Sequence, residues 1–548
     1  MYLKSILTFL VIIVPLDTKI YLNHMASLFL PYEHGPLKFS LEKESAEKGE
    51  VDNARGLFYT VGGDFIHVVD IRDPRSPQIL FYMKKANAGF TDVGVCGDYV
   101  VATSDNATHP LNGRLYIFLA YDFDTQSLEL VNTLTVGSLP DMVAFTSDCK
   151  KAVIAIEGER REINGQAVDP EGEIAIVEFI PGLPLSFKIT NLNFKAFNSM
   201  AAAYMRRGVR KIFPNNTFSE DLEPEYVTIS DDDRTAYVVL QENNAMVKVD
   251  LTSDKIIDIF PLGTKDWSAL KLDPSDRDGG INLASYPIRG IYNPDSIKFM
   301  NINGEDYIIT ANEGDEKEYE FSNSEPWSES TEGSKLGRLL SNDVSDELKS
   351  LLMDETKLGR MPFSTTEQDL SQDGGKLLDF LTYGGRSFSL FRASDMSQAY
   401  DSGDKFEQEI KRSFPDYFNA AMKIGIPQIA EPEGIAAGRI GNKTVIFVTM
   451  ERPGMTAIFS IGSRGRLKPK FESIHNGAGC NPTKKVEELY RDREIQYGSA
   501  ETGVFIPKTD SPNGKDLFIV VGTFTSTVSI YEVKNNRGRK RYRPRYCQ

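Results

Sequence analysis

The sequence predicts an all-β fold, a seven-bladed β-propeller with long loop insertions. Short runs rich in Val, Ile, Tyr and Phe recur along the 548 residues between turns of Gly, Asn, Asp and Pro, and helical periodicity is rare. Many of these runs follow a short repeated motif. Repeated small β-units indicate a propeller, because one small sheet cannot bury both of its faces without a neighbour.

The repeated motif places an acid, usually after a proline, at the start of a strand. It occurs at Leu139–Val143, Glu223–Val227, Asn293–Ile297, Glu431–Ile435 and, without the proline, Ser499–Gly503. A polar turn and an apolar second strand such as Ala236–Leu240 follow, and often a third strand such as Met246–Asp250. Phe90–Val93 and a degenerate first unit near Ala46–Glu47 bring the expected number of blades to seven.

The last unit lacks an outer strand, and we expect Leu37–Leu41 to supply it and close the ring. Long gaps near residues 160–220, 262–290, 315–380 and 395–430 hold the few helix-like stretches, such as Val344–Leu352. We expect these insertions to decorate one face of the propeller.

The domain organisation follows from the two ends of the chain. Lys4 and the apolar run Ile6–Leu16 predict a signal peptide over residues 1–26, with an uncleaved anchor as the alternative. A single propeller domain is expected over 37–534 and a basic tail over 535–548, since Lys534–Gln548 holds seven Lys or Arg and no acid. The mature protein is therefore expected to be secreted or held at a cell surface, with no transmembrane span.

An extracellular protein can be glycosylated and disulfide-bonded. Asn106, Asn215 and Asn442 each begin an Asn-X-Thr acceptor tripeptide. Cys96 and Cys149 occupy the same place in two successive strand-turn-strand units, which predicts a disulfide between stacked blades. The alternative for these two residues is reduced, half-buried thiols.

The charge balance argues for cationic ligands. Lys and Arg number 62 against 78 Asp and Glu, so the net charge is −16. Nucleic acid is disfavoured as a partner because its phosphates need a basic face. Metal cations are the more natural ligands.

An acid opens the innermost strand of most predicted blades, so these side chains should converge on one end of the central channel. Repulsion among such carboxylates is relieved by Ca²⁺, which takes six to eight oxygen ligands. The alternative is that the acids only start strands. The expected ring comprises Asp92, Asp141, Glu225, Asp295, Glu433 and Glu501, with Glu47 as its least regular member.

Further oxygen ligands are expected near this ring. Polar clusters end several second strands, and from them we select Asn243, Asn312 and Glu313 as ligands beside the acids. Asp273, Asp276 and Asp278 form a separate calcium-loop candidate, followed by two glycines but without the flanking helices of an EF-hand. An acidic surface loop is the alternative there.

Most enzyme motifs are absent from the sequence. There is no phosphate-binding loop of the Walker type, no Gly-x-Ser-x-Gly and no His-Glu-x-x-His, and the five histidines are scattered. The remaining chemistry is Ca²⁺-dependent phosphoester hydrolysis, in which Arg386 or Arg210 would bind phosphate.

Several longer motifs resemble one family, the choice-of-anchor I family, over residues of about 40 to 534. They are Asp221–Val227, Leu240–Ala245, Ala311–Asp315, Tyr383–Ser389 and Asp510–Lys515. Animal members include mesenchyme-specific cell surface glycoproteins of biomineralising cells. The resemblance implies a secreted or surface-attached propeller glycoprotein linked to calcified skeleton or shell formation.

Three functions are thus expected. The first is a Ca²⁺-binding extracellular matrix or surface glycoprotein related to biomineralisation. The second is a Ca²⁺-dependent phosphomonoesterase, which the alkaline phosphatase label of some bacterial relatives keeps open. The third is a metal-free propeller that binds other proteins.

Overall fold

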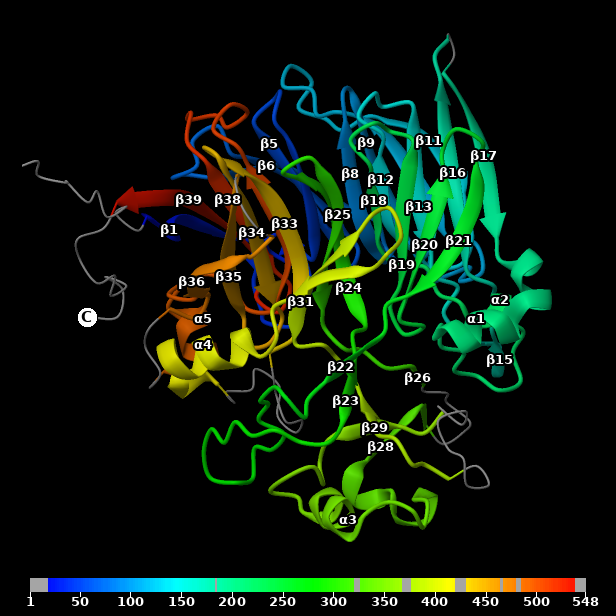
Figure 1. Cartoon of the computed structure of the whole chain (residues 1–548). Coiled ribbons are helices and arrows are strands. Elements are labelled where there is room, and N and C mark those ends of the chain that lie inside the picture. The colour runs from blue at the N-terminus through cyan, green and yellow to red at the C-terminus, as the bar shows by residue number, and fades with distance from the viewer. Residues whose placement is uncertain are drawn as a thin grey trace, which may run out of the picture.

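The computed structural model describes residues 18–182, 185–319, 326–366, 376–418, 430–463, 467–479 and 484–537. Within these ranges the chain forms seven four-stranded antiparallel sheets (Figure 1). The innermost strands contact one another in the cyclic order β4, β8, β12, β18, β24, β33, β37 and back to β4. This closed ring of sheets confirms the predicted propeller, and each sheet is one blade.

The first four blades follow the chain in order. Blade 1 is β4 (Lys48–Asp52), β5 (Leu57–Gly62), β6 (Phe65–Asp70) and β7 (Gln78–Lys84). Blade 2 is β8 (Phe90–Cys96), β9 (Tyr99–Ser104), β10 (Arg114–Leu119) and β11 (Leu130–Thr135). Blade 3 is β12 (Pro140–Phe145), β13 (Lys151–Ile156), β16 (Glu173–Ile180) and β17 (Ser186–Asn193), with the hairpin β14 (Arg161–Ile163) and β15 (Gln166–Val168) inserted. Blade 4 is β18 (Val227–Ile229), β19 (Thr235–Leu240), β20 (Ala245–Asp250) and β21 (Lys255–Pro261).

The last three blades include the ring closure. Blade 5 is β24 (Pro294–Ile302), β25 (Glu305–Asn312), β31 (Ser387–Arg392) and β32 (Gln398–Asp401). Blade 6 is β33 (Pro432–Ile440), β34 (Lys443–Met450), β35 (Met455–Gly462) and β36 (Lys470–Asn476). Blade 7 is β37 (Ala500–Ile506), β38 (Leu517–Gly522) and β39 (Thr527–Arg537), completed by β1 (Thr18–Phe29) from the other end of the sequence.

The closing strand differs from the one predicted. β1 pairs antiparallel with β39 along its whole length and buries Ile20 and Leu22, whereas Leu37 is exposed and forms the short hairpin β2 (Glu33–His34) and β3 (Leu37–Lys38). The propeller domain therefore includes Thr18–Phe29 and does not begin at residue 37. The predicted signal peptide overlaps it, since cleavage after residue 26 would remove most of β1; residues 1–17 lie outside the described residues.

The other terminus also extends beyond its predicted bound. β39 continues to Arg537, three residues into the predicted basic tail. Residues 538–548 lie outside the described residues. Among the described residues, no helix has the length and apolarity needed to cross a membrane.

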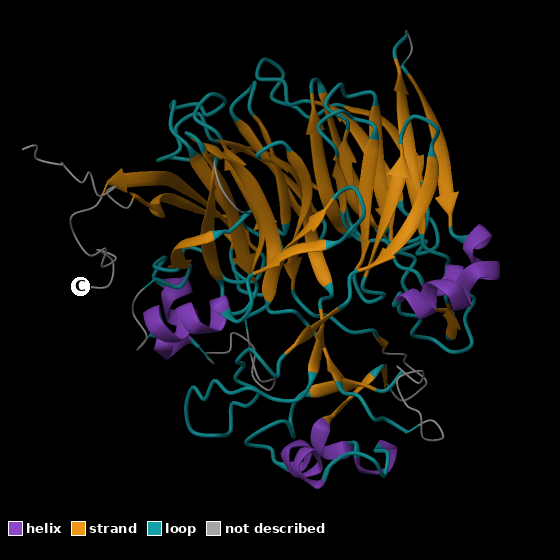
Figure 2. Cartoon of the chain, viewed as in Figure 1, coloured by secondary structure: helices purple, strands orange, loops and turns teal. Residues whose placement is uncertain are grey.

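The insertions gather on one face, as predicted. Helices α1 (Ala201–Arg207), α2 (Phe218–Asp221), α3 (Asp346–Met353), α4 (Lys405–Ser413) and α5 (Val486–Arg491) all lie toward the lower side in Figure 2. 3₁₀ turns lie at Lys195–Met200, Gly333–Lys335, Gly337–Leu339 and Pro415–Tyr417. Ser345 caps α3 by accepting a hydrogen bond from the Leu348 amide, so the helix begins at Asp346, two residues into the predicted stretch.

Two insertions build a small unit below blades 4 and 5. Its sheet is β22 (Thr264–Asp266), β23 (Arg289–Ile291) and β30 (Leu381–Thr382). Two antiparallel strand pairs complete it, β26 (Glu318–Tyr319) with β27 (Trp327–Ser328) and β28 (Ser330–Glu332) with β29 (Pro362–Ser364). Trp267 is fully buried in a separate core with Leu336, Leu352 and Phe363. The unit therefore has its own hydrophobic core.

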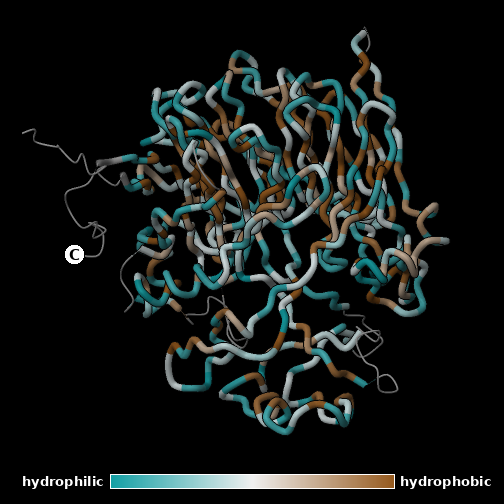
Figure 3. Tube along the Cα trace, in the orientation of Figure 1, coloured by the Kyte–Doolittle hydropathy of each residue, from teal (hydrophilic) through white to brown (hydrophobic). Residues whose placement is uncertain are grey.

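Apolar side chains fill the spaces between adjacent blades, and Figure 3 shows the hydrophobic segments concentrated in the blade strands. Phe447 of blade 6, for example, stacks on Phe518 of blade 7 with ring centroids 4.4 Å apart. Each blade thus buries its two faces against its neighbours, as the repeat predicts.

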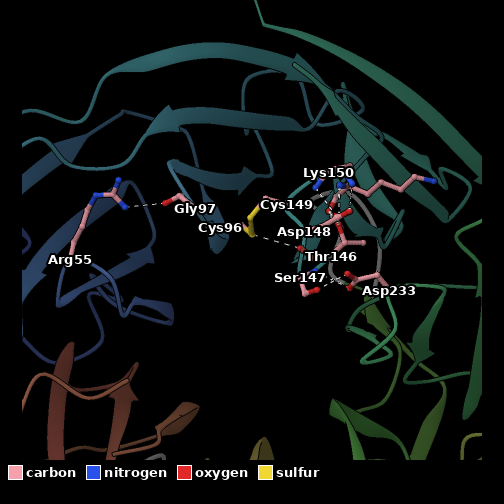
Figure 4. The surroundings of a disulfide bond; sticks show 10 residues. Arg55, Cys96, Gly97, Thr146, Ser147, Asp148, Cys149, Lys150 and Asp233 are labelled. Carbon is pink, nitrogen blue, oxygen red and sulfur yellow. Dashed lines mark hydrogen bonds and ion pairs between the residues drawn. A yellow bond between two sulfur atoms is a disulfide. The ribbon is translucent and has the colours of Figure 1, made fainter. Parts of the chain in front are cut away.

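The predicted disulfide is present. Cys96 ends β8, and Cys149 lies in the turn before β13, so the bond joins blades 2 and 3 (Figure 4). Of the three glycosylation acceptors, Asn215 and Asn442 are exposed, and Asn106 is half-buried.

Candidate cation site at the channel mouth

A repeated backbone irregularity aims the acids of the predicted ring. In blades 2, 3, 5, 6 and 7 the pairing of the innermost strand skips one or two residues just after its start, and the acid is among those skipped. A β-bulge re-aims the side chains of its extra residues. The acids held this way are Asp92, Asp141, Asp295, Glu433 and Glu501.

The ring carboxylates are buried and close enough to perturb one another. Burial raises the pKa of Asp92 to about 7, and burial with the nearby Glu451 and Asp295 raises that of Glu501 to about 7 although Lys48 lowers it. Burial, together with Glu313 and Asp295, holds the pKa of Glu433 well above its usual range. Acids from different blades therefore meet at one place, as predicted.

Glu47 belongs to the same group. Burial and the nearby Glu501 and Asp141 raise its pKa to about 8. Its amide donates to the Val61 carbonyl at 2.7 Å, which holds it at the entry to blade 1.

Lys48 is a ring residue that the sequence reasoning missed. Burial lowers its pKa, but the surrounding Asp295, Glu501, Glu433 and Asp141 raise it well above its usual value. Its Nζ lies 3.7 Å from Glu501 Oε2. Because the first repeat unit is degenerate, no motif marked this position, and only the closed ring brings Lys48 near these four carboxylates.

The tightest group of carboxylates is Glu313, Glu433 and Glu451. One oxygen of each lies within 4.8 Å of the others. Glu313 follows β25, Glu433 is in the β33 bulge and Glu451 follows β34, so the group spans blades 5 and 6. Glu433 is 8% exposed, and its Oε2 makes no hydrogen bond of good geometry among the described residues, although the Glu433 carboxyl lies close enough to Glu313 to lower the pKa of that residue.

The other two members have partners, and both oxygens of Glu451 are engaged, because Oε1 accepts from Arg452 Nη2 at 3.3 Å and from Ser499 Oγ at 3.5 Å. Glu313 Oε2 accepts from Gln241 Nε2 at 2.9 Å, and Arg452 lies 3.1 Å from Glu451 Oε2. The net charge of the group with Arg452 remains negative when all three glutamates are ionised. Burial and neighbouring acids raise the pKa of Glu313 well above its usual range, which shows that this charge is incompletely compensated.

Glycines give the backbone room to bring these glutamates together. A Cβ on Gly434, next to Glu433, would lie 2.2 Å from the Glu501 carbonyl oxygen. Gly314 has φ of +118°, and a Cβ there would lie 2.3 Å from Gly384. The chain that leaves β25 after Glu313 therefore passes against the chain that returns to β31, which fixes where the insertion begins and ends.

The family follows from comparison with known sequences. The model of the choice-of-anchor I domain matches residues 47–464. The chain belongs to the choice-of-anchor I family.

This choice-of-anchor I chain is similar in sequence to two further proteins and in fold to a solved structure. The mesenchyme-specific cell surface glycoprotein of Strongylocentrotus purpuratus is 29% identical over 365 residues, which are 59% of this chain and 46% of the relative. Gigasin-3a of Magallana gigas is 30% identical over 192 residues, 32% of this chain and 65% of the relative. The matches thus span about half and about two thirds of these relatives. The Myceliophteria thermophila Cps50 (Swd1) β-propeller domain superposes over 89% of this chain and 97% of its own with 7% identity and a TM-score of 0.41.

A second group of carboxylates in this choice-of-anchor I chain surrounds Glu225. Neither of its carboxylate oxygens has a hydrogen-bond partner of good geometry among the described residues. Burial, with Glu242, Glu157 and Asp141 nearby, raises its pKa well above the usual range. Asp295 Oδ2 is also without a partner among the described residues, and Asp295 is in electrostatic reach of both Glu242 and Glu451.

Asn243 and Asn312 do not act as ring ligands in this structure, which corrects their assignment. Asn243 is fully buried, accepts from the Glu223 amide and donates to the Asp221 carbonyl at 2.9 Å. Asn312 accepts from Thr310 Oγ1 and donates to the hydroxyls of Ser387 and Ser389. Both amides support the loops that carry Glu242 and Glu313.

The two arginines assigned to phosphate are already paired inside the protein, which corrects that expectation. Arg386 Nη1 donates to Glu407 Oε1 at 3.0 Å, and both side chains are buried. Arg210 is buried against Glu329 and donates to the Glu242 carbonyl at 2.6 Å. The contacts of these two arginines link the insertions to the blades.

The predicted calcium loop does not gather its three aspartates. Asp273 is buried, its Oδ2 accepts from the Asn282 amide, and its own amide donates to Glu407. Asp276 instead pairs with Arg360 at 3.3 Å. Asp278 Oδ1 has no partner, but within the described ranges these carboxylates form no group of three with converging oxygens.

Proposed function

We propose that this chain is a secreted or cell-surface propeller glycoprotein that binds Ca²⁺ through Glu313, Glu433 and Glu451 at its channel mouth. The observation that carries the proposal is the convergence of these three carboxylates around an unpartnered, buried oxygen of Glu433. Ca²⁺ is bound at 2.3–2.6 Å from each oxygen, so two oxygens of one ion are at most about 5 Å apart. The 4.8 Å limit within which the glutamates converge fits that span.

The donor set selects a hard cation. All three groups are carboxylates, whereas zinc and copper sites use imidazole or thiolate ligands. Three carboxylates supply three to six oxygens, and water would complete the shell. Mg²⁺ keeps most of its own water and needs near-ideal octahedral geometry, so a buried glutamate cluster suits Ca²⁺ better.

The extracellular role rests on independent features. The chain has a disulfide between blades 2 and 3, and two of its glycosylation acceptors are exposed. One relative is named as a cell surface glycoprotein. A net charge of −16 and a Ca²⁺ site together suit a protein of a calcified or Ca²⁺-rich matrix.

The test is calorimetric titration of Ca²⁺ into the metal-stripped protein. We expect saturable binding by the wild type and at least a tenfold loss of affinity in Glu433→Gln, because the substitution removes one anionic ligand without changing the shape. Glu305→Gln, at an exposed acid at the start of β25, is the matched control and should bind as the wild type does.

Two outcomes would overturn the proposal. One is the absence of Ca²⁺ binding by the wild type up to millimolar concentration. The other is equal binding by the wild type and Glu433→Gln, which would place the ion elsewhere. In the first case a metal-free propeller that binds other proteins becomes the better description.

A further inference from the structure

An acidic pocket lies beside the three-glutamate site and shares only Glu451 with it. It has a volume of about 370 Å³ and opens between the segment that enters blade 1 and the ends of blades 6 and 7. We call it the acidic pocket. Its lining is Glu42, Glu44, Glu451, Ser499, Glu501, Thr523 and Phe524.

The charges of the pocket are only partly compensated. Lys48 lies 3.7 Å from Glu501, and Arg452 lies 3.1 Å from Glu451. Within the described ranges Glu42 and Glu44 make no ion pair, and both are exposed at the rim. The lining contains four carboxylates and no lysine or arginine.

The rim is held in a fixed shape. Glu42 donates its amide to the Phe524 carbonyl at 2.9 Å, which fastens the segment to blade 7. Glu42, Glu44 and Ser499 all adopt left-handed backbone conformations, with φ of 57°, 47° and 49°. Non-glycine residues hold such conformations only where the surroundings impose them, and they cluster at ligand sites.

A buried hydroxyl inside the pocket has an unused hydrogen-bonding capacity. Thr523 is 8% exposed, and its Oγ1 makes no hydrogen bond of acceptable geometry within the described residues. It lies close enough to Glu501 to lower the pKa of that carboxyl, although burial and Glu451 hold this pKa above its usual value. A buried polar atom of this kind costs free energy unless a ligand or water satisfies it.

The pocket does not gather its carboxylates as the neighbouring three-glutamate site does. Among the described residues the only three carboxylates with converging oxygens are those of the neighbouring site, so the four acids of the pocket are too far apart for one coordination shell. A volume of 370 Å³ is also about twelve times the space of a water molecule in the liquid. The ring of Phe524 adds a face that attracts an organic cation.

We propose that the acidic pocket binds a basic side chain, lysine or arginine, of an extracellular partner protein. The proposal takes its partner from the proposed role at a surface or matrix, but it does not depend on Ca²⁺ binding. The ammonium or guanidinium group lies among Glu42, Glu44 and Glu501, donates to Thr523 Oγ1, and packs its aliphatic stem on Phe524.

The test uses small probes in EDTA at low ionic strength. Nα-acetyl-lysine methylamide and the arginine equivalent are titrated against the full chain, with the neutral norleucine analogue as the reference, and binding is followed by ligand-observed NMR. We expect millimolar affinity for one or both basic probes and at least tenfold weaker binding of norleucine. Comparable binding of norleucine would overturn the proposal.

Paired variants separate this pocket from the Ca²⁺ site. Glu42→Gln/Glu44→Gln should weaken binding of the basic probe at least tenfold and leave the Ca²⁺ titration unchanged, whereas Glu313→Gln should weaken Ca²⁺ binding and leave the probe binding unchanged. Glu129→Gln/Glu347→Gln, two exposed acids elsewhere, is the charge-matched control and should change neither.

Failure of the pocket proposal and failure of the proposed function would give different results. Equal probe binding by the wild type and Glu42→Gln/Glu44→Gln overturns the pocket proposal, whatever the Ca²⁺ result. Loss of Ca²⁺ binding in the wild type with retained probe binding overturns the proposed function alone. Because Glu42 and Glu44 are exposed, their variants should melt within a few degrees of the wild type, which a thermal scan checks.

Discussion

Some buried charges in this propeller are paired with an opposite charge, and others lie beside charges of the same sign. Arg386 and Glu407 form a buried ion pair at 3.0 Å that joins the return of the insertion to α4. Glu433 has an unpartnered oxygen and faces further acids. In the first arrangement the charge is compensated within the protein, and in the second it is left to a proton or to the cation proposed above.

The paired arginine gives a prediction on stability. Removing one member of a buried ion pair typically costs about 3–5 kcal/mol because the other charge is left uncompensated. Arg386→Met should therefore lower the free energy of unfolding by about that amount in urea titrations at pH 8. The loss should shrink near pH 5, because burial already raises the pKa of Glu407 to about 7 and the lone carboxyl would be protonated there.

The double variant Arg386→Met/Glu407→Leu serves as the control for this prediction. Replacing both charges with apolar groups should recover much of the lost stability, as buried pairs replaced together often do. If Arg386→Met unfolds at the same urea concentration as the wild type, the ion pair contributes nothing, and the guanidinium is available for another role.

At the level of elements, ring closure depends on one strand from the far end of the chain. β1 supplies the outer strand of blade 7 and buries Ile20 and Leu22 against it. A ring closed by strands from both ends of the chain cannot open without breaking this pairing. We therefore expect a shortened chain to fold only if it keeps β1.

Two chain lengths test the importance of β1. A chain that begins at Thr18 should fold, whereas one that begins at Ser27 should lose cooperative unfolding or aggregate, as seen by thermal scanning and gel filtration. Within the full chain, Leu22→Ala should cost about 2–4 kcal/mol, the usual range for deleting a buried leucine side chain. Equal melting of the two shortened chains would show that β1 is dispensable.

The disulfide is a second link between elements. Cys96 and Cys149 are 53 residues apart, and closing a loop of that size typically stabilises a protein by about 2–4 kcal/mol. Cys149→Ser should lower the free energy of unfolding by that amount in urea. Cys96→Ser/Cys149→Ser should unfold as the single variant does, and addition of a reductant should bring the wild type to the same midpoint.

For the whole molecule, the buried acids of the channel predict a stability that depends on pH, and the proposed Ca²⁺ site predicts a dependence on Ca²⁺. Burial raises the pKa of Asp92 from an ordinary 3.8 to about 7, and it raises that of Glu501, from an ordinary 4.5, also to about 7. A carboxyl with a raised pKa binds its proton more tightly in the folded state. Its contribution to stability is fully present below about pH 4 and is lost as the pH rises through about 7.

The corresponding measurement is urea unfolding in EDTA and in millimolar Ca²⁺ at pH 5.5, 6.5 and 8. In EDTA the free energy of unfolding should fall between pH 5.5 and 8. Ca²⁺ binds the deprotonated carboxylates, so it should stabilise the protein most at pH 8 and reduce the fall. Parallel curves with and without Ca²⁺ would contradict a cation in the channel, and Glu433→Gln in EDTA should show a shallower fall than the wild type.

Much of the fold could be predicted from the sequence because the relevant signals are local. Alternating apolar strands, polar turns and the recurring acid mark each blade, and the position of Cys96 and Cys149 in equivalent turns predicts their bond. Local patterns also place the acids at strand starts. The pairing of β1 with β39 spans about 500 residues, so no local signal distinguished it from a leader sequence.

The sequence by itself determined that this chain is a propeller with acids at the starts of its inner strands, because strand periodicity and repeat spacing are properties of neighbouring residues. Only the tertiary structure decided which acids meet. It brought Glu451 from a turn of blade 6 beside Glu313 of blade 5, placed Lys48 among the ring acids, and turned Arg386 toward Glu407. These are contacts across blades, and closure of the ring fixes them.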